Sequence, residues 1–139
     1  VAQAAASELV SLLPGQSHES LAACDLTLVA SGTAALEAAL FKRPMVIAYR
    51  MNGLSWQMMR RMRYQAWVGL PNILCRDFIV PERIQGDADP VTLATDVLAW
   101  LDDPARADAL RSRFTELHHL LRRDTARTAT DAIEKILQD

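Results

Sequence analysis

The stretch LTLVASGTAALEAALFKRPMVIAYR, which runs from Leu26 to Arg50, decides the fold of this chain. A short apolar run at 26–30 leads through a small turn into helix-forming residues at 34–40, and a second apolar run follows at 45–49. Two apolar strands joined by one helix predict a right-handed βαβ unit. The strands should be parallel and covered by helices on both faces, which places the chain in the α/β class.

The turn between the first strand and the helix, Ser31-Gly32-Thr33, lies beyond the carboxyl end of the strand, where α/β sheets bind ligands. Gly32 lets a ligand approach the backbone, and the unpaired N–H groups at the start of the helix can hold a phosphate. Glu37 lies one turn deeper on the same face as Thr33, where it can accept hydrogen bonds from sugar hydroxyls. Spacing alone favours a simpler alternative, in which Ser31 or Thr33 is an N-cap and Glu37 is solvated.

The composition is that of an ordinary globular protein of one domain. The chain has 139 residues, of which 50% are hydrophobic and 23% charged, and its formal net charge is −2. The positive charge is unevenly placed, because residues 38–76 contain seven lysines and arginines and no acidic residue. This asymmetry predicts one face that meets phosphate or an anionic membrane surface, whereas the overall charge gives no reason to expect a nucleic-acid partner.

The cysteines and the amino terminus bear on location. Cys24 and Cys75 are the only cysteines, they lack metal-ligand spacing, and they indicate free thiols in a reducing cytoplasm. No apolar run reaches membrane-spanning length, and the amino terminus has no signal-peptide pattern. Because the sequence begins at Val1 rather than at Met, we expect it to be a fragment of a longer chain.

The segment before the central stretch is predicted to be helical. Residues 1–13 suit a helix, or a helix that leads into a strand, and a Pro-Gly pair ends this segment. Ser17 is a good N-cap for a short helix over 18–23. His18 stands alone in that helix, and we expect it at the surface rather than in a ligand-binding or catalytic role.

The segment after the central stretch begins with a predicted strand and ends in helices. Residues 67–74 predict a third strand that ends in a Pro-Asn turn, in which Asn72 is a turn residue or offers its amide to a ligand. The residues at 77–86 show no clear pattern. Three helices are then predicted, with their starts marked by Pro90, Pro104 and Asp124.

Residues 52–65, NGLSWQMMRRMRYQ, form a basic amphipathic segment. A helix of this kind can lie on an anionic membrane or hold acyl chains. An equally good alternative is that the methionine stripe belongs to the core and the arginines are solvated. The residues that would contact lipid are Trp56, Met58, Met59, Arg60, Arg61, Met62 and Arg63.

Several common catalytic and cofactor motifs are absent from the sequence. There is no Walker lysine loop, no G-x-G-x-x-G, no H-E-x-x-H and no G-x-S-x-G. No cysteine and histidine cluster stands at metal-binding spacing, and no general base stands out. We therefore expect no catalytic residue, no metal site and no cofactor in this part of the protein.

Several motifs, taken together, resemble the lipid-A-disaccharide synthase family. They are ASGTAALE at 30–37, KRPMV at 42–46, AYR at 48–50, LPN at 70–72, GQS at 15–17 and ELH at 116–118. The resemblance covers nearly the whole chain in order and is most specific from Ala30 to Asn72. Members of that family are inverting glycosyltransferases (family 19) of the GT-B type, in which two Rossmann-like halves face each other across a cleft. The resemblance implies that residues 1–139 form a single α/β domain, most of the carboxyl-terminal, donor-binding half, which ends in a helical segment.

The resemblance also implies a reaction and a site. The family joins UDP-2,3-diacylglucosamine to 2,3-diacylglucosamine 1-phosphate, releasing UDP and the disaccharide 1-phosphate precursor of lipid A in lipopolysaccharide biosynthesis in Gram-negative bacteria. Such an enzyme is cytoplasmic, peripheral on the anionic inner membrane, and associated with homodimers. The implied UDP-sugar contacts are Ser31, Gly32 and Thr33 to the diphosphate, Glu37 to the ribose, Asn72 at the border of the pocket and Arg50 as a further phosphate contact.

The chain departs from the family pattern in what it lacks. Resembling enzymes use an amino-terminal half for the acceptor and the catalytic carboxylate, and they carry a Gly-Ser-Arg phosphate loop upstream of the stretch that begins at Leu26. Without these parts we expect no activity and weak nucleotide binding. Two alternatives stay open, namely another UDP-sugar GT-B enzyme, such as a peptidoglycan N-acetylglucosaminyltransferase, and a noncatalytic α/β module that binds a membrane or a partner through residues 52–65.

Overall fold

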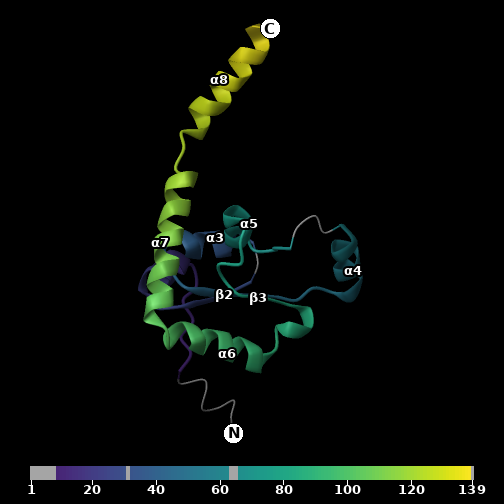
Figure 1. Cartoon of the computed structure of the whole chain (residues 1–139), viewed down its shortest axis with the longest axis vertical. Coiled ribbons are helices and arrows are strands. Elements are labelled where there is room, and N and C mark those ends of the chain that lie inside the picture. The colour runs from purple at the N-terminus through teal and green to yellow at the C-terminus, as the bar shows by residue number, and fades with distance from the viewer. Residues whose placement is uncertain (1–8, 31, 63–65, 139) are drawn as a thin grey trace.

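The computed structural model describes residues 9–30, 32–62 and 66–138, without the side chains of residues 59, 60, 62 and 138 (Figure 1). Its first two thirds contain both helices and strands, and helices alone make up the last third. The elements are α2 (Ser17–Ala23), β1 (Thr27–Val29), α3 (Thr33–Leu40), β2 (Met45–Tyr49), α4 (Gly53–Met62), α5 (Leu70–Cys75), β3 (Glu82–Ile84), the 3₁₀ turn η1 (Gln85–Asp87), α6 (Pro90–Leu101), α7 (Pro104–Leu121) and α8 (Thr125–Gln138).

The three strands form a parallel sheet in the order β1-β2-β3. Thr27 of β1 is paired with Met45 of β2, and Ile47 of β2 is paired with Glu82 of β3. Helices α3 and α5 lie on one face of the sheet and α6 on the other (Figure 1). The central strand is therefore covered on both sides, and Met45, Val46 and Ile47 are all 0% exposed. This arrangement confirms the predicted α/β class and the parallel pairing of β1 with β2.

Helix α7 packs against α3 and contributes side chains to the core. Phe114 and Leu117 of α7 are buried, and the alanines of α3 that are buried with them are small enough for the two helices to pack closely. On the opposite face Trp100 of α6 is 3% exposed, and its indole N–H donates to the carbonyl oxygen of Met45 at 3.1 Å. Each face of the central strand is thus held by a different helix.

The predicted third strand at 67–74 is wrong. Leu70–Cys75 is a helix instead, and Pro71 lies in its first turn, where the missing N–H of proline costs no hydrogen bond. The third strand is Glu82–Ile84, whose residues are all half-buried. Two of its three residues are charged, as is common in strands at a sheet edge. The sequence therefore contains no apolar run that would predict this strand.

The helices outside the sheet region largely follow the sequence. Residues 9–13 contain no helix or strand, so that part of the predicted amino-terminal helix is wrong, and residues 1–8 lie outside the described residues. The next helix begins at Ser17 itself, and its N-cap is Gln16. At the other end Asp124 caps α8 as predicted, because its carboxylate accepts from the N–H of Arg127 at 3.0 Å.

Helices α4 and α8 stand apart from the packed layers. Figure 1 shows α8 extending from the end of α7 away from the sheet, and α4 lying beyond the edge formed by β3. Apolar side chains on both helices are exposed, among them Leu54 and Met58 on α4 and Ile133 and Leu137 on α8. The described residues do not pack against these apolar faces of α4 and α8.

Candidate functional site

The candidate site lies at the carboxyl edge of the sheet, where β1 and β2 end side by side. Gly32 has a backbone φ of 123° and ψ of −153°, a conformation that is essentially confined to glycine. Gly32 is the N-cap of α3 and, having no side chain, cannot cap the helix as Ser or Thr would. Thr33 and Ala34 follow as exposed residues of the first turn, so their N–H groups point out of an uncapped helix end.

The sequence left open whether Ser31 or Thr33 is the N-cap of this helix, and the geometry answers this question for Thr33. Thr33 is the first residue of the helix rather than its N-cap, and no side chain caps α3 among the described residues. Ser31 lies outside the described residues. The open helix end carries the positive end of the helix dipole, which favours an anion.

Glu37 lies one turn further along α3 on the side that faces α2. Its side chain is 44% exposed, and its carboxylate Oε2 lies 3.8 Å from Nε2 of His18. The ring of His18 also lies 5.6 Å from the ring of Phe41. His18 is at the surface as predicted, but the sequence gave no sign that α2 would bring it beside Glu37, because the two residues are separated by a strand.

Arg50 follows β2 directly, and its side chain is joined to the turn after β3. Its Nε donates to the carbonyl oxygen of Gln85 at 3.0 Å. The side-chain amide of Gln85 in turn accepts from the N–H of Met51 at 2.7 Å and donates to the carbonyl oxygen of Met51 at 3.0 Å. Together with Gly86, these residues line an open hollow of about 240 Å³. Sequence reasoning missed Gln85, since no pattern marks it.

Asn72, predicted as a turn residue or a ligand contact, is instead a buried helical residue with 0% exposure. Its Oδ1 accepts from the N–H groups of Ile79 and Val80 at 2.9 and 3.0 Å. Its Nδ2 donates to the carbonyl oxygen of Val80 and to Oε1 of Glu82, both at 2.9 Å. All four hydrogen bonds of the amide are therefore made within the chain. The turn prediction is wrong, and a ligand could use this side chain only by displacing one of these partners.

Glu82 completes the network around Asn72. Its two carboxylate oxygens accept from the N–H groups of Val68 and Gly69 at 2.9 and 2.8 Å, at the start of α5. A β-carbon at Gly69 would lie 2.3 Å from Cδ1 of Ile47, so the backbone here packs directly on the central strand. The network therefore fixes α5 on the sheet.

The basic helix α4 presents apolar and positive groups to solvent. Leu54 is 81% exposed and Met58 63%, one turn apart on the same side of the helix. Trp56 is half-buried and Arg61 exposed, whereas the side chains of the other proposed lipid contacts, at 59, 60, 62 and 63, lie outside the described residues. Leu54, Met58 and Arg61 line, with two polar neighbours, an open hollow of about 500 Å³. The alternative in which the apolar stripe is core does not hold for Leu54 and Met58.

The described residues contain neither a metal-binding cluster nor a membrane-spanning helix. No group of three or more histidine, cysteine, aspartate or glutamate side chains in them could hold a metal ion. None of the helices that the structure describes combines the length and hydrophobicity needed to cross a membrane.

Comparisons with known proteins point to one family. The family model described as lipid-A-disaccharide synthetase matches residues 2–136. A relative from Albidiferax ferrireducens named lipid-A-disaccharide synthase is 61% identical over 131 residues, which make up 91% of this chain and 34% of the relative. Relatives of the same name from Verminephrobacter eiseniae and Thiobacillus denitrificans are 58% and 54% identical, covering 94% and 93% of this chain and 34% and 35% of their own length.

The chain thus spans about a third of the length of the curated relatives it matches. The match nevertheless runs over almost all of its own residues, including the whole sheet and the candidate edge. The resemblance seen in the motifs is confirmed, and the chain belongs to the lipid-A-disaccharide synthetase family.

Proposed function

We propose that this chain is the donor-binding part of an inverting glycosyltransferase. The whole enzyme joins UDP-2,3-diacylglucosamine to 2,3-diacylglucosamine 1-phosphate and releases UDP and lipid A disaccharide 1-phosphate. The observation that carries the proposal is the open end of α3, which lies at the carboxyl edge of the sheet with Glu37 one turn deeper. Relatives named lipid-A-disaccharide synthase support it.

Each group at the edge has a distinct part in holding the donor. The N–H groups of Thr33 and Ala34 donate to the diphosphate, and Gly32 lets the phosphate come close because it has no β-carbon. The carboxylate of Glu37 accepts hydrogen bonds from the ribose hydroxyls. The guanidinium of Arg50, after the neighbouring strand, adds positive charge beside the diphosphate.

The same contacts lower the barrier to glycosyl transfer. As the bond between the sugar and the diphosphate breaks, negative charge grows on the departing UDP. The helix end and Arg50 stabilise that charge more strongly in the transition state than in the bound donor, and this difference is what accelerates the reaction. The acceptor and the catalytic carboxylate belong, by resemblance, to the amino-terminal half of full-length family members.

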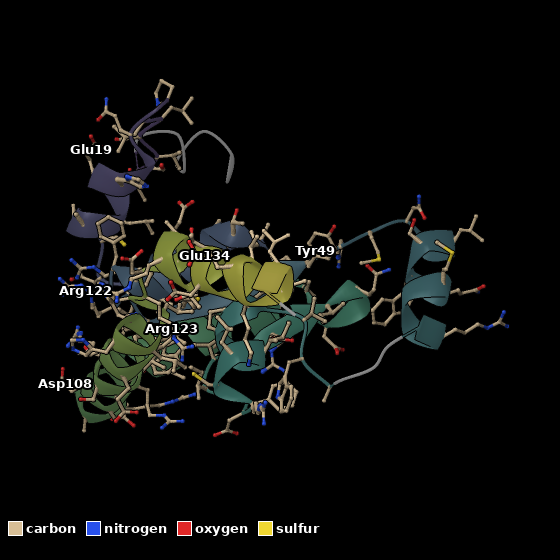
Figure 2. All side chains as sticks on the ribbon, turned by 90° about the horizontal axis from the view of Figure 1, so that it is seen from above. Glu19, Tyr49, Asp108, Arg122, Arg123 and Glu134 are labelled. Carbon is tan, nitrogen blue, oxygen red and sulfur yellow. The ribbon has the colours of Figure 1, made fainter. Side chains whose placement is uncertain are left out.

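The decisive test is the affinity for UDP, measured by calorimetry on a full-length chain that carries these 139 residues. We expect Glu37→Ala to weaken UDP binding by about tenfold or more, because the ribose loses its carboxylate partner. Glu134→Ala is the matched control, since Glu134 is an exposed glutamate on α8 (Figure 2), and α8 extends away from the sheet (Figure 1). Equal affinities in wild type and Glu37→Ala would contradict the assignment of Glu37, and absence of UDP binding altogether would end the glycosyltransferase proposal.

A second part of the proposal concerns the membrane. We propose that α4 meets the anionic inner-membrane surface on its cytoplasmic side, from which both lipid substrates would be drawn. The exposure of Leu54, Met58 and Arg61 supports this role, because a surface-bound helix needs apolar groups to insert and positive groups to meet the headgroups.

Co-sedimentation with vesicles that contain anionic phospholipid tests this second part. Replacing Arg60, Arg61 and Arg63 together by Glu should abolish most of the binding to such vesicles. Replacing Arg122, Arg123 and Arg127 by Glu makes the same change of charge near the start of α8 and is the control. If both triple variants bind like wild type, α4 has no role at the membrane.

A homodimer is a further proposal. It is supported by α8, on which Ile133, Ile136 and Leu137 are 58%, 74% and 79% exposed. Light scattering on the full-length chain measures the mass directly. A monomer at micromolar concentration would remove this proposal without affecting the donor site.

A further inference from the structure

Gln85 stands in an unusual backbone conformation at the end of β3. Its φ is 59°, in the left-handed region that residues with a β-carbon seldom adopt. A glycine would adopt this conformation without steric cost. The chain does place a glycine next to it, but Gly86 is not among the residues of positive φ. The left-handed position is thus occupied by Gln85, whose side chain forms hydrogen bonds within the fold.

The side chain of Gln85 continues the pairing of β2 with β3 beyond the last strand residues. Tyr49 and Ile84 are the final pair of the parallel ladder. One residue further on, the amide of Gln85 makes two hydrogen bonds with the backbone of Met51, at 2.7 and 3.0 Å. The chain that leaves β2 is therefore held at a fixed distance from β3 at the point where Arg50 projects.

The backbone of Gln85 holds Arg50 as well. Its carbonyl oxygen accepts from Nε of Arg50 at 3.0 Å, and no other hydrogen bond of the Arg50 guanidinium is recorded among the described residues. The two terminal nitrogens of the guanidinium remain available to a ligand in the hollow that these residues line. An arginine fixed by its Nε loses less conformational freedom when it binds an anion than a freely rotating one.

We propose that Gln85 is a positioning residue of the donor site, which holds Arg50 toward the diphosphate of a nucleoside diphosphate. This inference rests on the proposed function. The side-chain amide of Gln85 bonds to Met51 and its carbonyl oxygen to Arg50, so its effect on binding passes through these two residues. The three hydrogen bonds that join residues 50–51 to Gln85 are the structural basis of the effect.

The experiment measures UDP affinity in a full-length chain that carries this segment, with variants that separate the side chain from the backbone. Gln85→Gly removes the amide and relieves the left-handed strain. Gln85→Asn keeps a residue that tolerates this backbone, but its amide is one methylene too short to reach both groups of Met51. We expect both variants to raise the dissociation constant of UDP by about three- to tenfold, and Arg50→Ala to raise it at least as much.

Asp96→Asn is the control for a merely structural effect. Asp96 on α6 forms a bidentate ion pair with Arg83 of β3, with distances of 2.6 and 2.8 Å between their atoms. Breaking that pair should lower the melting temperature while leaving UDP affinity unchanged, because Asp96 takes no part in the donor edge.

The outcomes distinguish a failure of this inference from a failure of the proposed donor site. Weaker UDP binding in both Gln85 variants and in Arg50→Ala, with Asp96→Asn unchanged, supports the inference. It is overturned if Gln85→Gly binds UDP like wild type, or no worse than Asp96→Asn. It is also overturned if Arg50→Ala has no effect while Glu37→Ala weakens binding. If neither Glu37→Ala nor Arg50→Ala changes the affinity, the donor site itself is wrong.

Discussion

Two groups of polar residues lie near the same edge of the sheet, and they differ in how many of their hydrogen bonds are already made. Around Asn72 and Glu82, every polar atom of the amide has a partner in the chain, and the amide is fully buried. At the turn before α3, no side chain among the described residues caps the helix end, and the side chain of Glu37 is 44% exposed. The motif resemblance implies donor contacts in both groups, namely Asn72 in the first and Gly32, Thr33 and Glu37 in the second.

This difference separates residues that stabilise the fold from residues that can bind a ligand. A buried amide with four protein partners has no capacity left for a ligand unless the structure opens. Among the described residues, the N–H groups at the start of α3 and the half-exposed carboxylate of Glu37 keep most of their hydrogen-bonding capacity unused. Loss of Asn72 should therefore act on folding first, whereas loss of Glu37 should act on nucleotide binding alone.

The largest effect is expected for Asn72→Ala. It leaves the N–H groups of Ile79 and Val80 and one carbonyl oxygen buried without partners, which should cost about 3 kcal/mol of unfolding free energy. Amide hydrogen exchange at Ile79 and Val80, followed in a full-length chain, measures this loss locally. Glu37→Ala should leave the same exchange rates unchanged.

Asn72→Asp provides a sharper version of this test. The carboxylate still accepts from the two N–H groups, but it cannot donate to Val80 or to Glu82, and it places two carboxylates together. We expect a loss of stability close to that of Asn72→Ala. Exchange rates equal to wild type in both variants, together with weaker UDP binding, would show that Asn72 acts on the donor directly.

The second prediction compares two glycines, one in each group. A β-carbon at Gly69 would press on Cδ1 of the fully buried Ile47 at 2.3 Å, so Gly69→Ala should cost about 1–3 kcal/mol through overpacking. A β-carbon at Gly32 meets nothing within 4 Å, but its φ of 123° makes Gly32→Ala strained by a similar amount.

The two glycine variants should differ in their affinity for UDP. Gly32→Ala changes the backbone that faces the phosphate and should weaken UDP binding, whereas Gly69→Ala should leave it within about twofold once the protein is folded. Melting temperature and calorimetry on both variants measure the two effects. A Gly69→Ala protein that is stable but binds UDP poorly would mean that the start of α5 contacts the ligand.

The fold was predictable where burial dictates residue type. The strand Met45–Tyr49 is fully buried over its first three residues and half-buried over the last two, so its apolar residues could be recognised as a strand from the sequence alone. Glu82–Ile84 has no signal in the sequence because an edge strand needs no apolar run. Residues 67–74 suggest a strand because most of them are apolar, and they suggest a turn because proline and asparagine usually mark turns. In this chain the proline opens a helix, and the asparagine is the centre of a buried network.

The candidate edge was predictable only where neighbours in sequence are also neighbours in space. Gly32, Thr33 and Glu37 lie on one helix, so a pattern could group them. His18 and Gln85 come beside Glu37 and Arg50 through tertiary packing, across 19 and 35 positions of the chain. Nothing in one sequence records such contacts, and the left-handed backbone of Gln85 has no signal of its own in a residue that is common in helices.

The smallest effect concerns Asp89, which shows that exposure alone does not mark a ligand group. Asp89 is the N-cap of α6, and its carboxylate accepts from the N–H groups of Val91 and Thr92 at 3.0 and 3.1 Å. Hydrogen bonding by Thr92, through its side chain and its N–H, lowers the pKa of the Asp89 carboxyl. Its Oδ1 is thus used to cap α6, so we expect replacement of Asp89 to affect stability and to leave UDP binding unchanged.

The pH dependence has a definite sign. Because the folded pKa of Asp89 lies below its unfolded value of about 3.9, ionised Asp89 stabilises the fold at neutral pH. This contribution falls away as the pH drops below about 4 and through the lower folded pKa. In Asp89→Asn the amide oxygen still caps α6 but does not titrate. The variant should be slightly less stable than wild type at pH 7, and the gap should narrow progressively as the pH falls below about 4, as measured by hydrogen exchange at the start of α6. A gap that stays constant with pH would show that charge on Asp89 contributes nothing to the cap.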